Sequence, residues 1–246
     1  MLVLLPPSET KAPGGDGPPL DFDTLSHPAL NPVRRKLAEA LADLAHDVPA
    51  SLAALGLSER QHAEVARNEE LFDAPTTPAL HRYTGVLYDA LDAGSLTGAA
   101  ARRAHERLAV ASALFGIARA GDPIPAYRLS GGNVLPGVGP LRELWRPALE
   151  PELSEVDELL VDLRSGAYAA LARLPPAVTV RVVSIDGAGK RTTVSHFNKA
   201  YKGKLARALV SARTEPKSVT GLLRVASAAG LTVHRTGERE LEMLAE

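Results

Sequence analysis

The chain has 246 residues, and its 28 basic and 29 acidic side chains leave a formal net charge of −1. That length suits one large domain or two small ones, and 45% hydrophobic with 23% charged residues is the composition of an ordinary globular protein. The absence of cysteine excludes disulfides, thiolate catalysis, iron–sulfur clusters and Cys-ligated zinc. The apolar runs are shorter than the about 20 residues of a membrane span, and the N-terminus lacks the basic start of a signal peptide. We therefore expect a cytoplasmic protein that has no membrane partner.

The first hundred residues predict one strand followed by helices. Residues 2–5 are an apolar run that ends at Pro6-Pro7, which is typical of a buried strand. Asn31-Pro32 predicts a helix start, and apolar residues at spacings of three and four then predict an amphipathic helix over 32–47. Three further helices are expected from a capping-box pattern and two Thr starts, at 58–72, 77–91 and 98–107.

The rest of the chain mixes strands with helices. An apolar run at 107–117 predicts a strand that enters a turn, and 121–140, with five Gly and four Pro, predicts a long loop of the kind that is often functional. A helix is expected at 141–149, and a helix that leads to a strand end is expected over 156–163. Two strands, at 178–185 and 191–197, are expected around a turn at 186–189. Helices at 198–213 and 218–229 should follow, then a strand at 231–235 and a final strand.

The order of these elements predicts the fold class. We find no internal repeat and no regular βαβ alternation. The sequence therefore predicts a single α+β domain over 1–246, with a mixed twisted sheet flanked by helices and a helix-rich part over about 30–107.

The charges are distributed unevenly along the chain. Between 148 and 164 there are six acids and one base, whereas 181–217 holds nine Lys/Arg and two acids. The helix expected at 198–213 carries four of these cations, namely Lys199, Lys202, Lys204 and Arg207. Such a face can neutralise phosphates, as in nucleic-acid binders, although a solvated surface helix carries similar charges.

A second segment is compatible with nucleic-acid binding. LPGVGPLREL at 135–144 is similar to the hairpin of a helix-hairpin-helix unit, which presents backbone N–H groups to a DNA phosphate. The preceding RLSGGN cannot form the first helix of such a unit. A plain turn before a helix is therefore the interpretation that the sequence favours.

Polar side chains on loops form a third candidate site. Ser8, Glu9 and Lys11 follow the first strand, at the edge where mixed sheets commonly carry sites. Tyr127-Arg128 lies in the long loop, and His196 ends a predicted strand. Together they could form an anion site with an acid–base pair, in which Glu9, Lys11, Tyr127 and His196 are catalytic candidates and Ser8 and Arg128 bind the anion. Each of them taken singly is more often a surface or structural residue.

Several common signatures are missing from the sequence. The seven His show no HExxH or HxH spacing, so we expect no metal site. There is also no Walker loop, no GxGxxG after a strand and no GxSxG elbow, and we expect no cofactor.

Six blocks, taken in order, resemble the YaaA peroxide-stress family of bacterial cytoplasmic proteins. They are LLPPSETK (4–11), YTGVLYDAL (83–91), LAVASALFGIARAGDPIPAYRL (108–129), LRELW (141–145), DLRSGAY (162–168) and HFNKAYKGKLAR (196–207). The matching residues include Gly85, Tyr88, Ser112, Tyr127, Arg128, Tyr168, Lys199, Lys202 and Arg207.

The resemblance implies a single α+β domain that binds DNA and limits damage and free iron during peroxide stress, and it implies no established reaction. We therefore expect a DNA-binding stress protein in which Arg128 and the cations of the basic helix contact phosphates. The alternative is an enzyme for a small anionic or nucleobase-like substrate, with a pocket formed by residues 7–11, 127–128 and 196–207. The sequence leaves the oligomeric state open.

Overall fold

The computed structural model describes residues 1–185, 191–192 and 195–245, with side chains described for 1–184 and 198–245. The turn predicted at 186–189 and the side chain of His196 lie outside these residues. In the described part of the chain, eight strands form one mixed sheet. They are β1 (Leu2–Leu5), β3 (Leu108–Ser112), β4 (Gly116–Arg119), β8 (Leu160–Asp162), β9 (Val178–Ile185), β10 (Arg191–Thr192), β11 (Val233–Arg235) and β12 (Glu240–Ala245).

The middle of this sheet is parallel and its edges are antiparallel. The strand order is β11-β12-β9-β8-β1-β3-β4, with β10 paired to β9. The five strands from β12 to β3 run parallel, whereas β11, β4 and β10 pair antiparallel with their neighbours. Two small antiparallel pairs lie apart from it, β2 (Thr77–Pro78) with β5 (Pro123–Ile124) and β6 (Val134–Leu135) with β7 (Gly139–Pro140).

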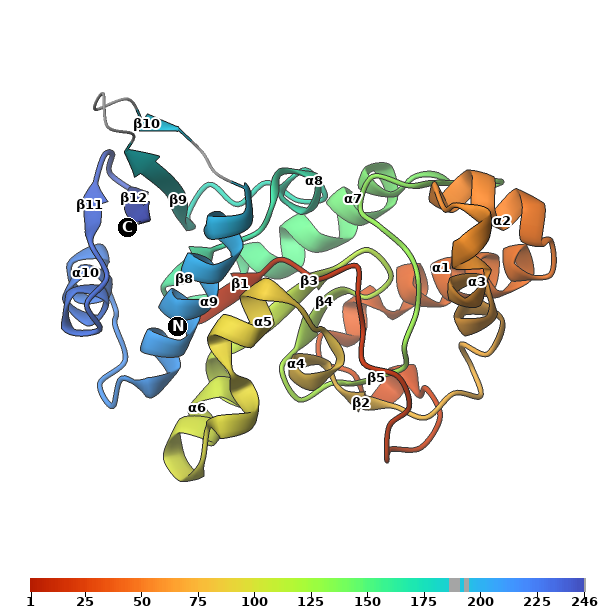
Figure 1. Ribbon diagram of the computed structural model, residues 1–246, viewed down its shortest axis with the longest axis horizontal. Coiled ribbons are helices and arrows are strands. Elements are labelled where there is room, and N and C mark those ends of the chain that lie inside the picture. Colours follow the sequence, from red (N-terminus) through yellow and green to blue (C-terminus); the bar gives the residue numbers. More distant parts are fainter. Residues whose placement is uncertain (186–190, 193–194, 246) are drawn as a thin grey trace.

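Helices surround the sheet on several sides (Figure 1). They are α1 (Asn31–Ala45), α2 (Val48–Leu55), α3 (His62–Glu69), α4 (Ala79–Arg82), α5 (Val86–Leu91), α6 (Gly98–Arg107), α7 (Leu141–Ser154), α8 (Gly166–Ala169), α9 (Ser195–Ser211) and α10 (Val219–Ala228). Figure 1 shows α1, α2 and α3 at one end of the molecule and α10 with β11 at the other. Helix α9 packs against α5, α6 and α10 and against β9 and β12.

Strand β1 lies at the centre of the core. All four of its residues are at most 2% exposed, and nearly all buried apolar side chains of the described residues form one continuous cluster around it. An uninterrupted apolar strand is what a parallel strand covered on both faces requires. No helix in the described part of the chain is both long and apolar enough to cross a membrane.

The structure confirms the predicted α+β class and several element boundaries. Strand β1 spans 2–5 and α6 spans 98–107, as predicted, and the Ser58–Gln61 capping box is present. Asn31 is not the N-cap of α1, because that position is Leu30. The Asn31 side chain instead donates a hydrogen bond to the carbonyl of Phe22 and accepts one from Arg34. It therefore joins α1 to the segment around Phe22 and does not cap the helix.

The helix predicted over 77–91 is wrong as one element. Thr77–Pro78 pairs with Pro123–Ile124 as strands, and the helical part is divided into α4 and α5. The division occurs where Tyr83 forms a β-bridge with Lys11 and where Gly85 adopts a positive φ of 97°. The backbone between the two helices is therefore extended, and this brings the loop after β1 against it.

Other predicted elements differ at their ends. No helix occurs over 156–159 before β8. Of the strand predicted at 191–197, Arg191–Thr192 is strand, whereas α9 begins at Ser195. Helix α7 continues past 149 to Ser154 with Pro147 and Pro151 inside it. Helix α2 was not predicted, although Asp47 caps it by accepting a hydrogen bond from the Ala50 N–H.

The segment at 135–144 is a β-hairpin followed by a helix. Strands β6 and β7 form the hairpin, and α7 begins directly after it at Leu141. No helix lies between Pro125 and Asn133. The plain turn before a helix, which the sequence favours, is therefore what this segment forms.

Candidate functional site at the carboxyl edge of the sheet

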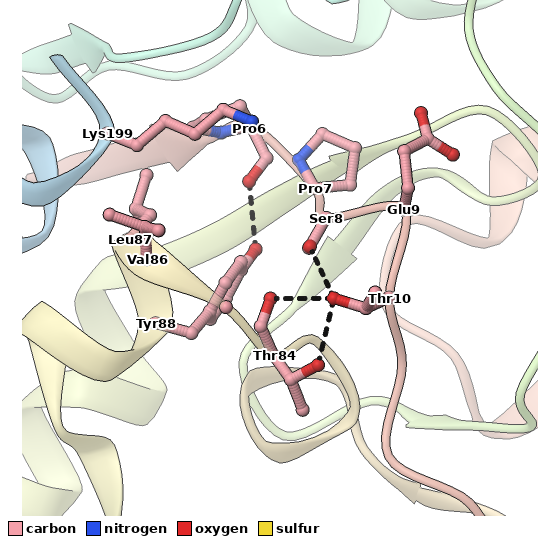
Figure 2. Close-up of a pocket in the computed structure, with 11 residues that line it drawn as sticks. Pro6, Pro7, Ser8, Glu9, Thr10, Thr84, Val86, Leu87, Tyr88 and Lys199 are labelled. Carbon is pink, nitrogen blue, oxygen red and sulfur yellow. Dashed lines mark hydrogen bonds between the residues drawn. The ribbon is translucent and has the colours of Figure 1, made fainter. Parts of the chain in front are cut away.

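The loops that follow β1, β3 and β8 meet at one edge of the sheet, because these neighbouring strands are parallel. A cavity of about 290 Å³ lies there, between the loop after β1, the start of α5 and helix α9 (Figure 2). Its lining residues are Pro6, Pro7, Ser8, Glu9, Thr10, Thr84, Gly85, Val86, Leu87, Tyr88 and Lys199.

The cavity has a hydroxyl-bearing side. The Ser8 and Thr10 hydroxyls lie 3.1 Å apart, and the Thr84 hydroxyl donates to Thr10 Oγ1 at 3.1 Å. Figure 2 shows Val86 and Leu87 on another side and Lys199 extending across the top. Tyr88 donates to the carbonyl of Pro6 at 2.9 Å, which ties α5 to the end of β1.

Lys11 lies directly behind this loop and is buried, with 6% of its surface exposed. Its ammonium group donates to the carbonyl of Ser8 at 3.2 Å and lies 4.2 Å from the centroid of the Tyr127 ring. Burial lowers the pKa of Lys11 to about 7, although the Glu9 carboxylate acts in the opposite direction. An amine with this pKa changes its charge near neutral pH.

Three buried hydroxyl groups form a chain beside Lys11. The Tyr127 hydroxyl lies 2.9 Å from that of Tyr83 and 2.8 Å from that of Ser112, and the Phe115 N–H donates to Ser112 Oγ at 2.9 Å. Burial raises the pKa of Tyr83 to about 12 and raises the pKa of Tyr127 well above its usual range. Both phenols are therefore neutral hydrogen-bonding groups at physiological pH.

Glu9 and Arg128 form an ion pair at the same edge. Glu9 Oε2 lies 2.9 Å from Arg128 Nη1, and Glu9 Oε1 accepts a hydrogen bond from the Ser130 hydroxyl at 2.7 Å. The backbone of Arg128 is held by the buried Asn68, which accepts from its N–H at 2.7 Å and donates to its carbonyl at 2.9 Å. The loop at 127–130 is thus fixed against α3 and against the loop after β1.

The structure brings most of the predicted pocket residues together. Glu9, Lys11, Tyr127 and Arg128 are joined by the contacts above, and Ser8 and Lys199 line the cavity. These residues come from the three segments that the sequence analysis placed in one pocket. The side chain of His196 is outside the described residues, so its catalytic role stays a prediction.

Three cations of the basic helix have partners within the protein. Lys202 is buried and donates to the carbonyls of Leu163 and Arg164, at 2.9 and 3.2 Å. Arg207 donates to the carbonyls of Leu91 and Asp92, both at 2.8 Å, where α5 ends. The exposed Lys204 places its ammonium 4.5 Å from the centroid of the Tyr201 ring. The phosphate contacts predicted for Lys202 and Arg207 stay a prediction, and they would require these side chains to exchange bonds that they already make.

Several site residues were not among the predicted ones. They are Asn68, Tyr83, Thr10, Thr84 and Ser130, while Tyr88, Ser112 and Tyr168 entered only through the family resemblance. Nothing in the spacing of the sequence marks Tyr83 or Asn68, because the partners of each lie 44 and 60 positions away. In the described part of the chain, no group of three His, Cys, Asp or Glu side chains is placed to hold a metal ion.

Comparison with known proteins identifies the family. The family model described as peroxide stress protein YaaA matches residues 1–236. A UPF0246 protein of Corynebacterium efficiens is 50% identical over 237 residues, which cover 95% of this chain and 94% of that protein. A UPF0246 protein of Streptomyces coelicolor is 45% identical over 238 residues, with coverage of 95% and 92%. The family model and these relatives extend over nearly the whole chain. This chain therefore belongs to the peroxide stress protein YaaA family.

Proposed function

We propose that this chain acts in the response to peroxide stress through the site at the carboxyl edge of its sheet, and that the ligand of this site is a small anionic or nucleobase-like molecule. The observation that carries the proposal is the convergence of Glu9, Lys11 and Arg128 beside the cavity. Two cations and one carboxylate, drawn from separate segments and partly or wholly buried, are the kind of arrangement found at ligand sites.

The cavity walls indicate the chemistry of the ligand. Pro6, Pro7 and Leu87 offer apolar surface, and the Ser8, Thr10 and Thr84 hydroxyls offer hydrogen bonds. A flat, apolar ring with a polar edge matches both surfaces. The cavity volume of about 290 Å³ is near the lower end for ligand sites, which favours a small molecule.

Some charged side chains of the site would bind the ligand, and another would take part in chemistry. Lys199, exposed at the cavity wall, and Arg128 would hold the anionic group, and the charge of Lys11 would add to the field behind the loop. Glu9 lines the cavity and would accept or give a proton. Tyr127 would hold the Lys11 ammonium over its ring face.

Binding of AMP and of adenine tests this proposal by isothermal titration calorimetry. We expect both to bind the wild-type protein, and we expect Lys199→Met to weaken AMP binding by roughly three- to tenfold with little effect on adenine, because only AMP carries a phosphate. Lys204→Met removes an exposed lysine of the same helix that does not line the cavity, and it should leave both affinities unchanged. A wild-type protein that binds neither molecule would contradict the proposal.

DNA binding is the second candidate function. It is favoured by the exposure of Lys199 and Lys204 on α9, with Lys199 beside the cavity, because exposed lysines can neutralise phosphates of a strand that passes the site. Binding to duplex or bubble DNA should then weaken steeply between roughly 50 and 200 mM salt, and a Lys199→Gln/Lys204→Gln variant should lower the logarithmic salt slope by about 2. An affinity that does not depend on salt would count against this function.

A further inference from the structure

The Glu9–Arg128 ion pair is asymmetric in a way that concerns the ligand. The Glu9 side chain is 47% exposed and lines the cavity, whereas the Arg128 side chain is 14% exposed. Among the described residues, two side chains hold the carboxylate, Arg128 through Nη1 and Ser130 through its hydroxyl. The Glu9 side chain therefore has solvent beside it, whereas most of the Arg128 side chain is covered by protein.

Arg128 is fixed in place and has a hydrogen-bond donor to spare. Its backbone N–H and carbonyl are both bonded to the side chain of Asn68, which is 1% exposed. Its Nε is buried and has no hydrogen-bond partner among the described residues. The guanidinium therefore meets the Glu9 carboxylate through Nη1 and leaves Nε unpaired, and an anion that replaced Glu9 could bond to Nη1.

The charges around Arg128 favour replacement of the Glu9 carboxylate by the anionic group of a ligand. Lys11 donates to the backbone carbonyls of Ser8 and Glu9, so its ammonium lies beside the same loop. Glu64 and Arg67, which also influence Lys11, form an ion pair with each other at 2.8 Å and so largely cancel. The Glu9 carboxylate is thus the anion that balances Arg128, and a ligand anion in its place keeps that balance.

We propose that Glu9 is an internal counter-ion of Arg128, which the anionic group of the ligand displaces, so that Glu9 selects against ligands without such a group. This inference rests on the function proposed above and assigns a specificity role within the same site. A neutral ligand makes no favourable contact with Arg128, because the Glu9 carboxylate remains paired with the guanidinium. A phosphate or carboxylate ligand gains the contact with the partly buried Arg128 and releases Glu9 toward the cavity, where Glu9 can act on the bound molecule.

Calorimetric titration of AMP and adenosine into the wild-type protein and Glu9→Gln tests the inference. Since the amide of Glu9→Gln carries no charge, we expect AMP to bind this variant roughly tenfold more tightly than the wild type and adenosine to bind both equally. Glu64→Gln is the matched control, because it removes one negative charge near Lys11 from a residue that pairs with Arg67 and not with Arg128. The control should leave the ratio of AMP to adenosine affinities unchanged.

The outcomes separate this inference from the proposed function. If the wild-type protein binds AMP and Glu9→Gln binds it equally or more weakly, Glu9 is no displaceable counter-ion and the inference is overturned alone. An equal gain for Glu64→Gln would also overturn it, since the effect would then be one of overall charge. If no variant binds AMP or adenosine, the proposed function fails and this inference fails with it.

Discussion

Lys11 is the residue at which burial and charge conflict most directly. Its ammonium is removed from water and compensated by backbone carbonyls and the faces of Tyr127 and Tyr83, which lie 4.2 and 5.4 Å from it as ring centroids. These contacts favour the charged form, but burial is the larger influence and lowers the pKa to about 7. The residue therefore holds a charge that small changes in its surroundings can remove.

This lowered pKa predicts how stability depends on pH. Between about pH 7 and the ordinary lysine value of 10.5, the unfolded chain binds a proton that the folded protein does not, so the free energy of unfolding should rise with pH in this window. The slope from this one group is at most about 1.4 kcal/mol per pH unit. Urea unfolding at pH 7, 8 and 9 should show the rise in the wild type and a smaller one in Lys11→Met.

The tyrosines do not obscure this measurement. Burial raises the pKa values of Tyr83, Tyr88 and Tyr127, so they do not ionise below pH 9. Lys204→Met, at an exposed lysine, is the control and should keep the wild-type slope. An unchanged slope in Lys11→Met would show that Lys11 does not titrate in this range.

At the scale of elements, the packing of α9 on α5 positions one wall of the cavity. Gly203 lies in the middle of α9, and a Cβ added there would lie 2.2 Å from the carbonyl oxygen of Leu87 in α5. Arg207, one turn further, donates to the carbonyls at the end of α5. The two helices therefore approach more closely than a side chain allows, and the same contact brings Lys199 to the cavity.

Gly203→Ala is expected to destabilise the protein, although alanine is the better helix former by about 1 kcal/mol. The new methyl group meets backbone, which cannot move without separating α9 from α5, so we expect a loss of roughly 1–3 kcal/mol in the free energy of unfolding. Gly221→Ala in α10 is the matched control, because its Cβ would lie 3.4 Å from the nearest atom, an ordinary contact. Urea unfolding should show no loss for the control, and equal stability of Gly203→Ala and wild type would contradict the close approach.

At the scale of the whole molecule, the sheet and its helices share one core. Nearly all buried apolar residues in the described part of the chain form one cluster that runs from α1 through β1 to β12. Trp145, the one tryptophan of the sequence, is fully buried in this cluster and donates to the carbonyl of Ala113 at 2.7 Å. Its fluorescence therefore reports on the packing of this core.

A single core predicts cooperative unfolding, which would support the predicted single domain over 1–246. In urea, the red shift of Trp145 emission and the loss of helical circular dichroism should occur at the same midpoint. Two separate transitions would show that the helix-rich part or the C-terminal part unfolds independently of the core.

Several features of the fold follow from local patterns in the sequence. The apolar run of β1, the capping box before α3 and the boundaries of α6 were predictable because each depends on residues that are close together in the chain. Two of the three segments of the predicted pocket were also recognisable from local patterns, since Ser8, Glu9 and Lys11 follow a strand and Tyr127-Arg128 lies in a Gly- and Pro-rich loop. The family, too, was recognisable from its ordered blocks.

Only the tertiary structure decided whether a charged side chain faces the cavity or bonds within the protein. Lys199 and Lys202 lie three positions apart in the same helix, yet one lines the cavity and the other is buried on the loop after β8. The break between α4 and α5 arises because Lys11 pairs with Tyr83, more than 70 positions away. Composition and spacing show which side chains can carry charge, but burial and long-range partners, which exist only in the folded chain, decide whether that charge holds the fold or faces a ligand.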